Sequence, residues 1–137
     1  MTQSPLEQLL GALDRLDVDG TVALFAPDVR MMLADGRRAT GSEQARELIA
    51  SFMAQLRATG HRITAQWHQD DTWIAESDSS YELRDHLQLQ VPRAFFVRAN
   101  TTGIFEMRVY GAHEQALADH DPDAGGIRVG GHWLPPL

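Results

Sequence analysis

The chain has 137 residues, of which 43% are hydrophobic and 23% charged, as in a single globular domain and unlike a disordered or collagen-like chain. Twelve basic against 19 acidic residues give a formal net charge of −7, which disfavours binding to nucleic acid or anionic membranes. The sequence has no cysteine, so disulfides, thiolate nucleophiles and cysteine-based metal sites are excluded. With no signal-peptide pattern and no long apolar run, we expect a cytoplasmic protein that does not contact membranes.

The first predicted helix has a clear start. Ser4 is a suitable N-cap, Pro5 suits the first helical position, and Glu7 completes a capping box with Ser4. Leucines then recur at steps of three and four residues, which predicts one buried helix face. These leucines are Leu6, Leu9, Leu10, Leu13 and Leu16.

A second, short helix is expected to begin at Asp17 or Asp19 and to be stopped by Pro27. Residues 29–33 predict a strand, and Asp35–Gly36 predicts the turn that follows it.

Thr40 and Glu43 form another capping-box pattern that opens the longest predicted helix, and Gly60 is a natural stop. The apolar positions expected on its buried face are Ala45, Leu48, Ile49, Phe52, Met53 and Leu56.

From residue 61 the hydrophobic period changes from 3.6 to 2, which indicates strands. Ile63, Ala65 and Trp67 are expected on one face of the first of them. The following strands are expected over residues 73–83, 88–99 and 104–112, with polar turns between them. Helices followed by strands predict an α+β domain whose antiparallel sheet curls around three helices and encloses a ligand pocket.

Three segments carry a resemblance to a known family. Residues 16–29, 41–46 and 102–110 resemble the opening, the entry to the third helix and the last strand of the nuclear-transport-factor-2-like superfamily. The most similar branch is the SnoaL-like, polyketide cyclase-like one. The resemblance implies a cone-shaped α+β fold over residues 1–117, three N-terminal helices packed on a strongly curved antiparallel sheet, a pocket and a homodimer. Residues 118–137 are expected to form a loosely structured tail.

The resemblance leaves the activity open, because the superfamily holds isomerases, cyclases, hydrolases, dehydratases and proteins without known activity. The polar catalytic positions of its steroid isomerases fall on Leu9, Leu33 and Phe95, so that reaction is not expected.

Glu76 and Asp78 stand opposite the first arginine and aspartate of the epoxide-hydrolase members, but Val109 stands at the final aspartate. Epoxide hydrolysis by that set of residues is therefore also not expected.

His113 is the leading catalytic candidate. Alternation along the last strand puts it on the same face as Met107 and Val109, and the acid/base aspartate of SnoaL-type cyclases falls on Ala112 or His113. Imidazole is a natural acid/base catalyst near neutral pH. The alternative is a histidine at a frayed strand end that faces solvent.

Glu76 and Asp78 are a second candidate, since paired carboxylates can divide into an acid and a base. Trp73 and Tyr81 define the more apolar, opposite face of the same strand. Either a bulge within residues 77–80 brings the carboxylates inward, or they lie on a solvated outer face.

Several residues are expected to line the pocket, with the Tyr81 hydroxyl orienting the ligand or assisting catalysis. The expected wall residues are Leu33, Trp67, Trp73, Phe95, Met107 and Val109. The alternative for each is plain core or a dimer interface.

Arg98 and Arg108 lie inside strands and require partners, for which Glu106, Glu82 or a ligand carboxylate are available. None of the six histidines has metal-site spacing and no phosphate-binding glycine motif is present, so no metal or cofactor is expected.

Two functions follow from these patterns. One is a cofactor-free acid/base enzyme of the cyclase, isomerase or hydrolase type, acting on a small apolar, polyketide-like or aromatic molecule. The other is a non-catalytic module that binds a ligand or forms a dimer.

Overall fold

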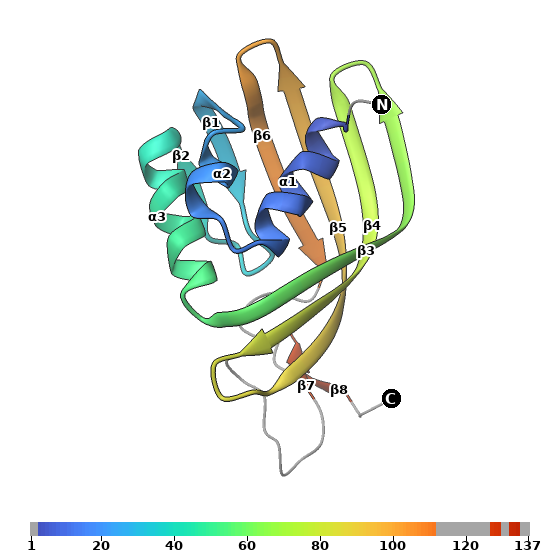
Figure 1. The fold of residues 1–137 in the computed structure, drawn as a ribbon. Helices are drawn as coiled ribbons and strands as arrows, with labels where there is room; N and C mark the ends of the chain where they lie inside the picture. The colour runs from blue at the N-terminus through green and yellow to red at the C-terminus, as the bar shows by residue number, and fades with distance from the viewer. Residues whose placement is uncertain (1–2, 112–126, 130–131, 135–137) are drawn as a thin grey trace.

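The computed structural model describes residues 3–111, 127–129 and 132–134, and it has three helices against a curved sheet of six strands (Figure 1). The predicted α+β class is confirmed. The helices are α1 (Pro5–Asp14), α2 (Val18–Val22) and α3 (Ser42–Met53). The sheet contains β1 (Phe25–Met32), β2 (Arg38–Thr40), β3 (Leu56–Gln69), β4 (Thr72–Leu83), β5 (Gln88–Asn100) and β6 (Gly103–Gly111).

The strand order across the sheet is β2-β1-β6-β5-β4-β3. All neighbouring strands are antiparallel except β1 and β6, which pair in parallel with Met31 opposite Met107. The expectation of a wholly antiparallel sheet is therefore wrong at this one pairing. Strand β2 pairs with one edge of β1 directly after it in the chain, whereas β6 reaches the other edge only after α3, β3, β4 and β5 and runs in the same direction as β1.

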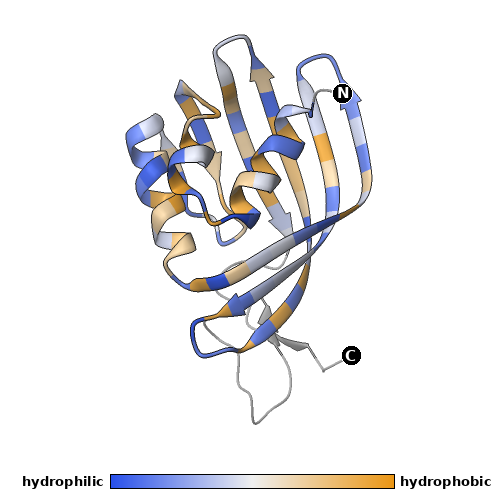
Figure 2. Cartoon of the chain, viewed as in Figure 1, coloured by the Kyte–Doolittle hydropathy of each residue, from blue (hydrophilic) through white to orange (hydrophobic). Residues whose placement is uncertain are grey.

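The helices lie together on one face of the sheet (Figure 1). Helix α1 packs on β3, β4 and β5, while α3 packs on β1 and β2. Four leucines of the predicted stripe, Leu6, Leu9, Leu10 and Leu13, are buried in the resulting core, whereas Leu16 lies beyond the end of α1 and is partly buried. Apolar and polar residues alternate along the strands (Figure 2), which gives the sheet an inner face toward the helices and an outer face.

The capping box at the start of α1 is confirmed. The Glu7 amide donates to the Ser4 hydroxyl at 3.1 Å, and the Ser4 amide donates to the Glu7 carboxylate at 3.3 Å. Helix α2 starts after Asp17, whose carboxylate accepts the Gly20 amide at 2.9 Å. It ends at Val22, so Pro27 does not stop it; Pro27 lies in β1, where the pairing with β6 shifts register.

The start and end of α3 differ from the prediction. Its N-cap is Gly41 without a side-chain cap, and the Thr40 amide donates to Gln44 rather than forming a box with Glu43. The helix ends at Met53, and Gly60 lies inside β3 instead of ending the helix. A Cβ built on Gly60 would lie 3.0 Å from the Ser80 hydroxyl, so this glycine allows β3 and β4 to pair closely.

A register shift between Ile63 and Ala65 divides β3 into two halves. Ile63 lies opposite Ser77 on the inner face, but Ala65 lies opposite Glu76 on the outer face. The expected single face for Ile63, Ala65 and Trp67 is therefore wrong, because one extra residue reverses the alternation.

Strands β4, β5 and β6 lie within one residue of the predicted bounds where these fall in the described part of the chain. Strand β1 begins at Phe25, ahead of the predicted start at residue 29, and β2 was not predicted. Ala112, His113 and most of the expected tail lie outside the described residues. Within that tail, β7 (Ile127–Val129) and β8 (His132–Leu134) form a short antiparallel pair. None of the helices in the described ranges is long and apolar enough to cross a membrane.

Candidate active site between the helices and the sheet

A small cavity lies between the helix layer and the inner face of the sheet. Its volume is about 20 Å³, which is room for roughly one water molecule. Ligand pockets typically measure about 300–1,000 Å³, so a larger guest requires the lining elements to move apart. The lining residues, which we call the chamber, are Leu13, Leu33, Ile49, Phe52, His61, Tyr81, Phe95, Met107 and Val109.

Five residues singled out from the sequence lie together in the chamber. They come from four different strands or their ends, and each is at most 4% exposed. They are Leu33, Tyr81, Phe95, Met107 and Val109. The alternation of each strand places them there, because the inner face of the sheet is the apolar one.

The chamber also contains a histidine that is held by a carboxylate. His61, on β3, has a side chain that is only 1% exposed, and its Nδ1 lies 2.6 Å from Oδ1 of Asp14. Asp14 is the last residue of α1, and its side chain is 34% exposed. The pair therefore connects the interior to the surface at the end of this helix.

The geometry of the pair determines which nitrogen of His61 carries the proton. An ionised carboxylate can only accept hydrogen bonds, so Nδ1 of His61 donates to Asp14. In the neutral ring Nε2 then holds a lone pair, and it makes no hydrogen bond to any residue of the described ranges. Nε2 is thus the position at which His61 can exchange a proton with a bound molecule.

Aromatic rings fix the orientation of the imidazole. The His61 ring meets Phe95 edge-on with centroids 5.2 Å apart, and it meets Tyr81 edge-on at 6.3 Å. Phe52 contacts Tyr81 in the same manner at 5.9 Å. A histidine held by a carboxylate and by rings has little freedom to leave its position, which favours proton transfer in a defined direction.

Polar side chains continue along the inner face beside the chamber. Ser77 and Ser79 of β4 are buried, with their hydroxyl oxygens 3.4 Å apart. Arg93 of β5 is buried opposite Ser77, and its guanidinium carbon lies 5.3 Å from the ring centroid of Tyr81. The inner face therefore carries a buried guanidinium beside the ring of Tyr81.

The predicted carboxylate pair lies elsewhere. Glu76 and Asp78 are exposed on the outer face of β4, and Asp78 forms an ion pair with Arg62. The alternative of a solvated outer face is the one observed, since the bulge lies on β3 and leaves the alternation of β4 intact. These carboxylates do not reach the chamber.

The two tryptophans predicted to line the pocket also lie outside the chamber. Trp67 is 54% exposed on the outer face, opposite Ile74, because of the β3 bulge. Trp73 is half-buried on the inner side of β4 and stacks on His68 with centroids 4.3 Å apart. His113, the leading candidate from the sequence, lies outside the described residues.

Sequence reasoning missed both members of the His61–Asp14 pair, although each left a signal. His61 is two positions before Ile63, so strand alternation places it on the apolar face. Asp14 follows Leu10 by four residues and therefore extends the buried stripe of α1. Their proximity depends on how α1 packs on β3, which no local pattern determines.

Charges on the outer face form a network around one carboxylate. Glu106, with a side chain 8% exposed, lies 2.9 Å from Arg108 and 3.7 Å from Arg98, which confirms the predicted partner of both arginines. The pKa of Arg108 is raised by its hydrogen bond to Tyr110 and then by Glu106. Arg98 also donates to Asp71 and holds the pKa of that carboxyl below its ordinary value.

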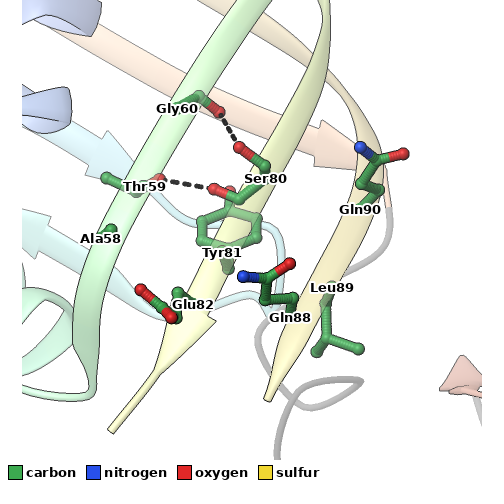
Figure 3. Close-up of a pocket in the computed structure, with 9 residues that line it drawn as sticks. All are labelled: Ala58, Thr59, Gly60, Ser80, Tyr81, Glu82, Gln88, Leu89 and Gln90. Atoms are coloured by element: carbon green, nitrogen blue, oxygen red, sulfur yellow. Dashed lines mark hydrogen bonds between the residues drawn. The ribbon is translucent and has the colours of Figure 1, made fainter. Parts of the chain in front are cut away.

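A larger hollow of about 290 Å³ lies on β3, β4 and β5 (Figure 3). Its polar groups are largely used within the sheet: the Thr59 hydroxyl donates to the Ser80 carbonyl at 3.0 Å, and the Ser80 hydroxyl donates to the Gly60 carbonyl at 3.4 Å. Glu82 is its only ionisable carboxylate. The hollow thus offers no acid/base pair comparable to that of the chamber.

No group of three or more potential metal ligands occurs among the residues that the structure describes. The chamber itself offers a single histidine among apolar and aromatic side chains.

Comparison with protein families gives one match over most of the chain. Residues 6–111 match the family model of the SnoaL-like domain. No curated protein is significantly similar in sequence to this chain.

Solved structures with the same fold have low sequence identity. A protein with a ketosteroid isomerase-like fold from Catenulispora acidiphila, in complex with trimethylamine, has a TM-score of 0.72 and 21% identity, covering 80% of this chain and 86% of its own. A proposed polyketide cyclase from Xanthomonas campestris has a TM-score of 0.68 and 18% identity, covering 77% and 86%. An LEH-like epoxide hydrolase from M. tuberculosis has a TM-score of 0.68 and 17% identity, covering 78% and 79%. These likenesses establish the fold, and the fold is compatible with more than one chemistry.

Proposed function

Because this chain belongs to the SnoaL-like domain family, we propose that it is a cofactor-free acid/base enzyme acting on a small apolar carbonyl compound of polyketide-like character. The observation that carries this proposal is the His61–Asp14 pair at the edge of an apolar, aromatic chamber. His61 transfers the proton, Asp14 positions His61, and Tyr81 orients the substrate.

In the proposed reaction, Nε2 of neutral His61 removes a proton from the carbon next to the substrate carbonyl. The C–H electron pair moves into the enolate, and the imidazolium that forms is stabilised by the Asp14 carboxylate across Nδ1–H. The imidazolium then gives its proton to a different carbon of a conjugated enolate, which gives isomerisation. Alternatively, the enolate carbon attacks a second carbonyl of the substrate and the imidazolium protonates the alkoxide that forms, which gives cyclisation.

The size of the chamber adds a requirement to this proposal. A volume of about 20 Å³ does not hold a carbonyl substrate, so α1 or α3 must move away from the sheet when substrate enters. Helix α1 contributes Leu13 to the lining of the chamber, and α3 contributes Ile49 and Phe52. Displacement of a helix by a ligand is a familiar mode of opening.

The test is α-proton exchange of cyclohexanone in D₂O, followed by NMR. The wild-type protein should accelerate exchange, and His61→Ala should lower the accelerated rate by about 100-fold or more, the usual contribution of a general base. Asp14→Asn changes the partly exposed partner of His61 and should lower the accelerated exchange rate less than His61→Ala does. His86→Ala alters an exposed histidine and should have no effect. Equal exchange rates for the wild type and for folded His61→Ala would show that His61 is not the base.

A second candidate function is a dimeric interaction module without catalysis. It is favoured by the exposure of Trp67, which is 54% accessible beside Ile74 on the outer face. Sedimentation velocity should then give twice the monomer mass, and Trp67→Ser should shift the protein toward the monomer. A monomeric wild type at high micromolar concentration would contradict this function.

A further inference from the structure

A basic groove lies on the outer face of β2, β1 and β6, on the opposite side of the sheet from the chamber. Its volume is about 170 Å³, and three guanidinium groups line it, those of Arg30, Arg38 and Arg108. Glu106 is the single carboxylate in the lining.

Strand register explains why these arginines come together. Met32 of β1 lies between Arg38 of β2 and Arg108 of β6, as its pairing partner on either side. In the adjacent row Arg30 lies opposite Glu106. Residues two apart on a strand share a face, so both rows project outward from the same part of the sheet.

The charges in the groove do not balance. Glu106 lies 2.9 Å from Arg108 and 3.7 Å from each of Arg30 and Arg98, so its one negative charge is shared among three guanidinium groups. Arg38 is exposed and forms no ion pair with any residue in the described part of the chain. Three cations against one anion leave a local excess of two positive charges on a chain whose net charge is −7.

The type of cation limits the classes of ligand that the groove can bind. The sequence contains no lysine, so every charge in the groove is a planar guanidinium that donates paired hydrogen bonds. Such groups recognise the oxygens of phosphate and carboxylate groups in a bidentate manner. An excess of two positive charges corresponds to a doubly charged anion, and a phosphate monoester carries nearly that charge at neutral pH.

Apolar side chains adjoin the arginines in the same row. Met32 is half-buried between Arg38 and Arg108, and the Arg108 guanidinium carbon lies 5.8 Å from the ring centroid of Phe96. Pairing continues from Phe96 to Ile74 of β4, so the row runs from charged to apolar across the sheet. A ligand with an anionic end and an apolar body therefore fits this surface better than a free inorganic ion.

We propose that this groove binds the phosphate group of a small aromatic or apolar phosphate monoester. Arg38 and Arg108 hold the phosphate oxygens from two sides, Arg30 adds a third cation, and Met32 and Phe96 contact the organic part. The three arginines of the groove do not line the chamber, and the almost fully buried Met107 is the residue that lines both.

Phenyl phosphate is the probe, titrated at constant ionic strength and followed by isothermal calorimetry and by amide shifts in NMR. We expect one site per chain, shifts at Met32, Arg38 and Arg108, and affinity at least ten-fold weaker in Arg38→Met. Arg62→Met removes an exposed arginine from the outer face of β3 and should leave binding unchanged. Thermal melting of both variants verifies that they are folded.

Inorganic phosphate is the second arm of the experiment. It should bind more weakly than phenyl phosphate, since it lacks the part that contacts Met32 and Phe96. Equal affinity of the two ligands would overturn the assignment to an organic monoester. Unchanged binding of phenyl phosphate in Arg38→Met, or its loss in Arg62→Met, would overturn the site itself. His61→Ala should bind phenyl phosphate as the wild type does, whatever the outcome of the cyclohexanone test.

Discussion

Asp14 and His61 are 47 positions apart in the chain, yet their side-chain atoms lie 2.6 Å apart. The carboxylate keeps contact with solvent while the imidazole is enclosed. The Asp14 carboxylate is thus already in place as a counter-ion when His61 takes up a proton. This arrangement suits a base that works inside an apolar chamber.

The Asp71–Arg98 contact gives a prediction at the same scale. Arg98 donates to Asp71 at 3.2 Å and lowers the pKa of Asp71 below its ordinary value of 3.8, with a smaller contribution from Thr72. Arg98→Met should therefore raise the pKa of Asp71 toward 3.8, as measured by NMR titration of the carboxyl carbon. Arg62→Met, which removes an ion pair of Asp78, is the matched control and should leave Asp71 unchanged.

The sign of the effect on stability follows from the same shift. A carboxyl with a lowered pKa in the folded state stabilises the protein above its unfolded pKa, and this contribution disappears as pH falls through the folded value. The free energy of unfolding of the wild type should thus lose the contribution of Asp71 below about pH 4. The free energy of unfolding of Arg98→Met should not show this decrease. An identical Asp71 titration in both proteins would contradict the assigned role of Arg98.

At the scale of elements, the turn into β6 depends on Gly103. Its φ is +125°, and a Cβ there would lie 2.8 Å from the Leu24 carbonyl oxygen and 2.9 Å from the Ala26 nitrogen. Gly36 is the matched control, since its φ is +89° but no atom lies within 4 Å of an added Cβ. The free energy of unfolding of Gly36→Ala should fall by about 1 kcal/mol from backbone strain alone.

The free energy of unfolding of Gly103→Ala should fall by about 3 kcal/mol or more, because the steric conflict with the start of β1 adds to the backbone strain. Urea unfolding of the two variants measures the difference directly. Equal losses would mean that β1 shifts freely at Leu24, contrary to the close approach described for this turn.

The sequence predicted most strands because alternation and turn residues are local signals. Gly60 shows the limit of such signals: glycine commonly ends a helix, but here it lies within β3 opposite Ser80. Trp67 shows a second limit, since one bulge after Ile63 moves it to the outer face. The apolar part of the chamber was predictable for the same local reason, whereas the His61–Asp14 contact depends on the packing of a helix against a distant strand.

At the scale of the whole molecule, one sheet separates two different environments. Between its inner face and the helices lies the chamber of apolar and aromatic residues with the imidazole of His61, whereas its outer face carries the groove of arginines around Glu106. Strand alternation alone produces this separation, because adjacent residues such as Met31 and Met32 point to opposite sides. In their described linings the proposed enzyme site and the proposed phosphate site therefore share Met107 alone.

Methyl NMR during a titration with cyclohexanone tests the central claim most directly. If the substrate site lies between the helices and the sheet, shifts should concentrate on Leu13, Leu33, Ile49 and Val109, together with the ring of His61. Ile74, on the outer face, serves as the internal reference and should not move. Shifts confined to Ile74, or an unchanged His61 ring at saturating ligand, would contradict the account.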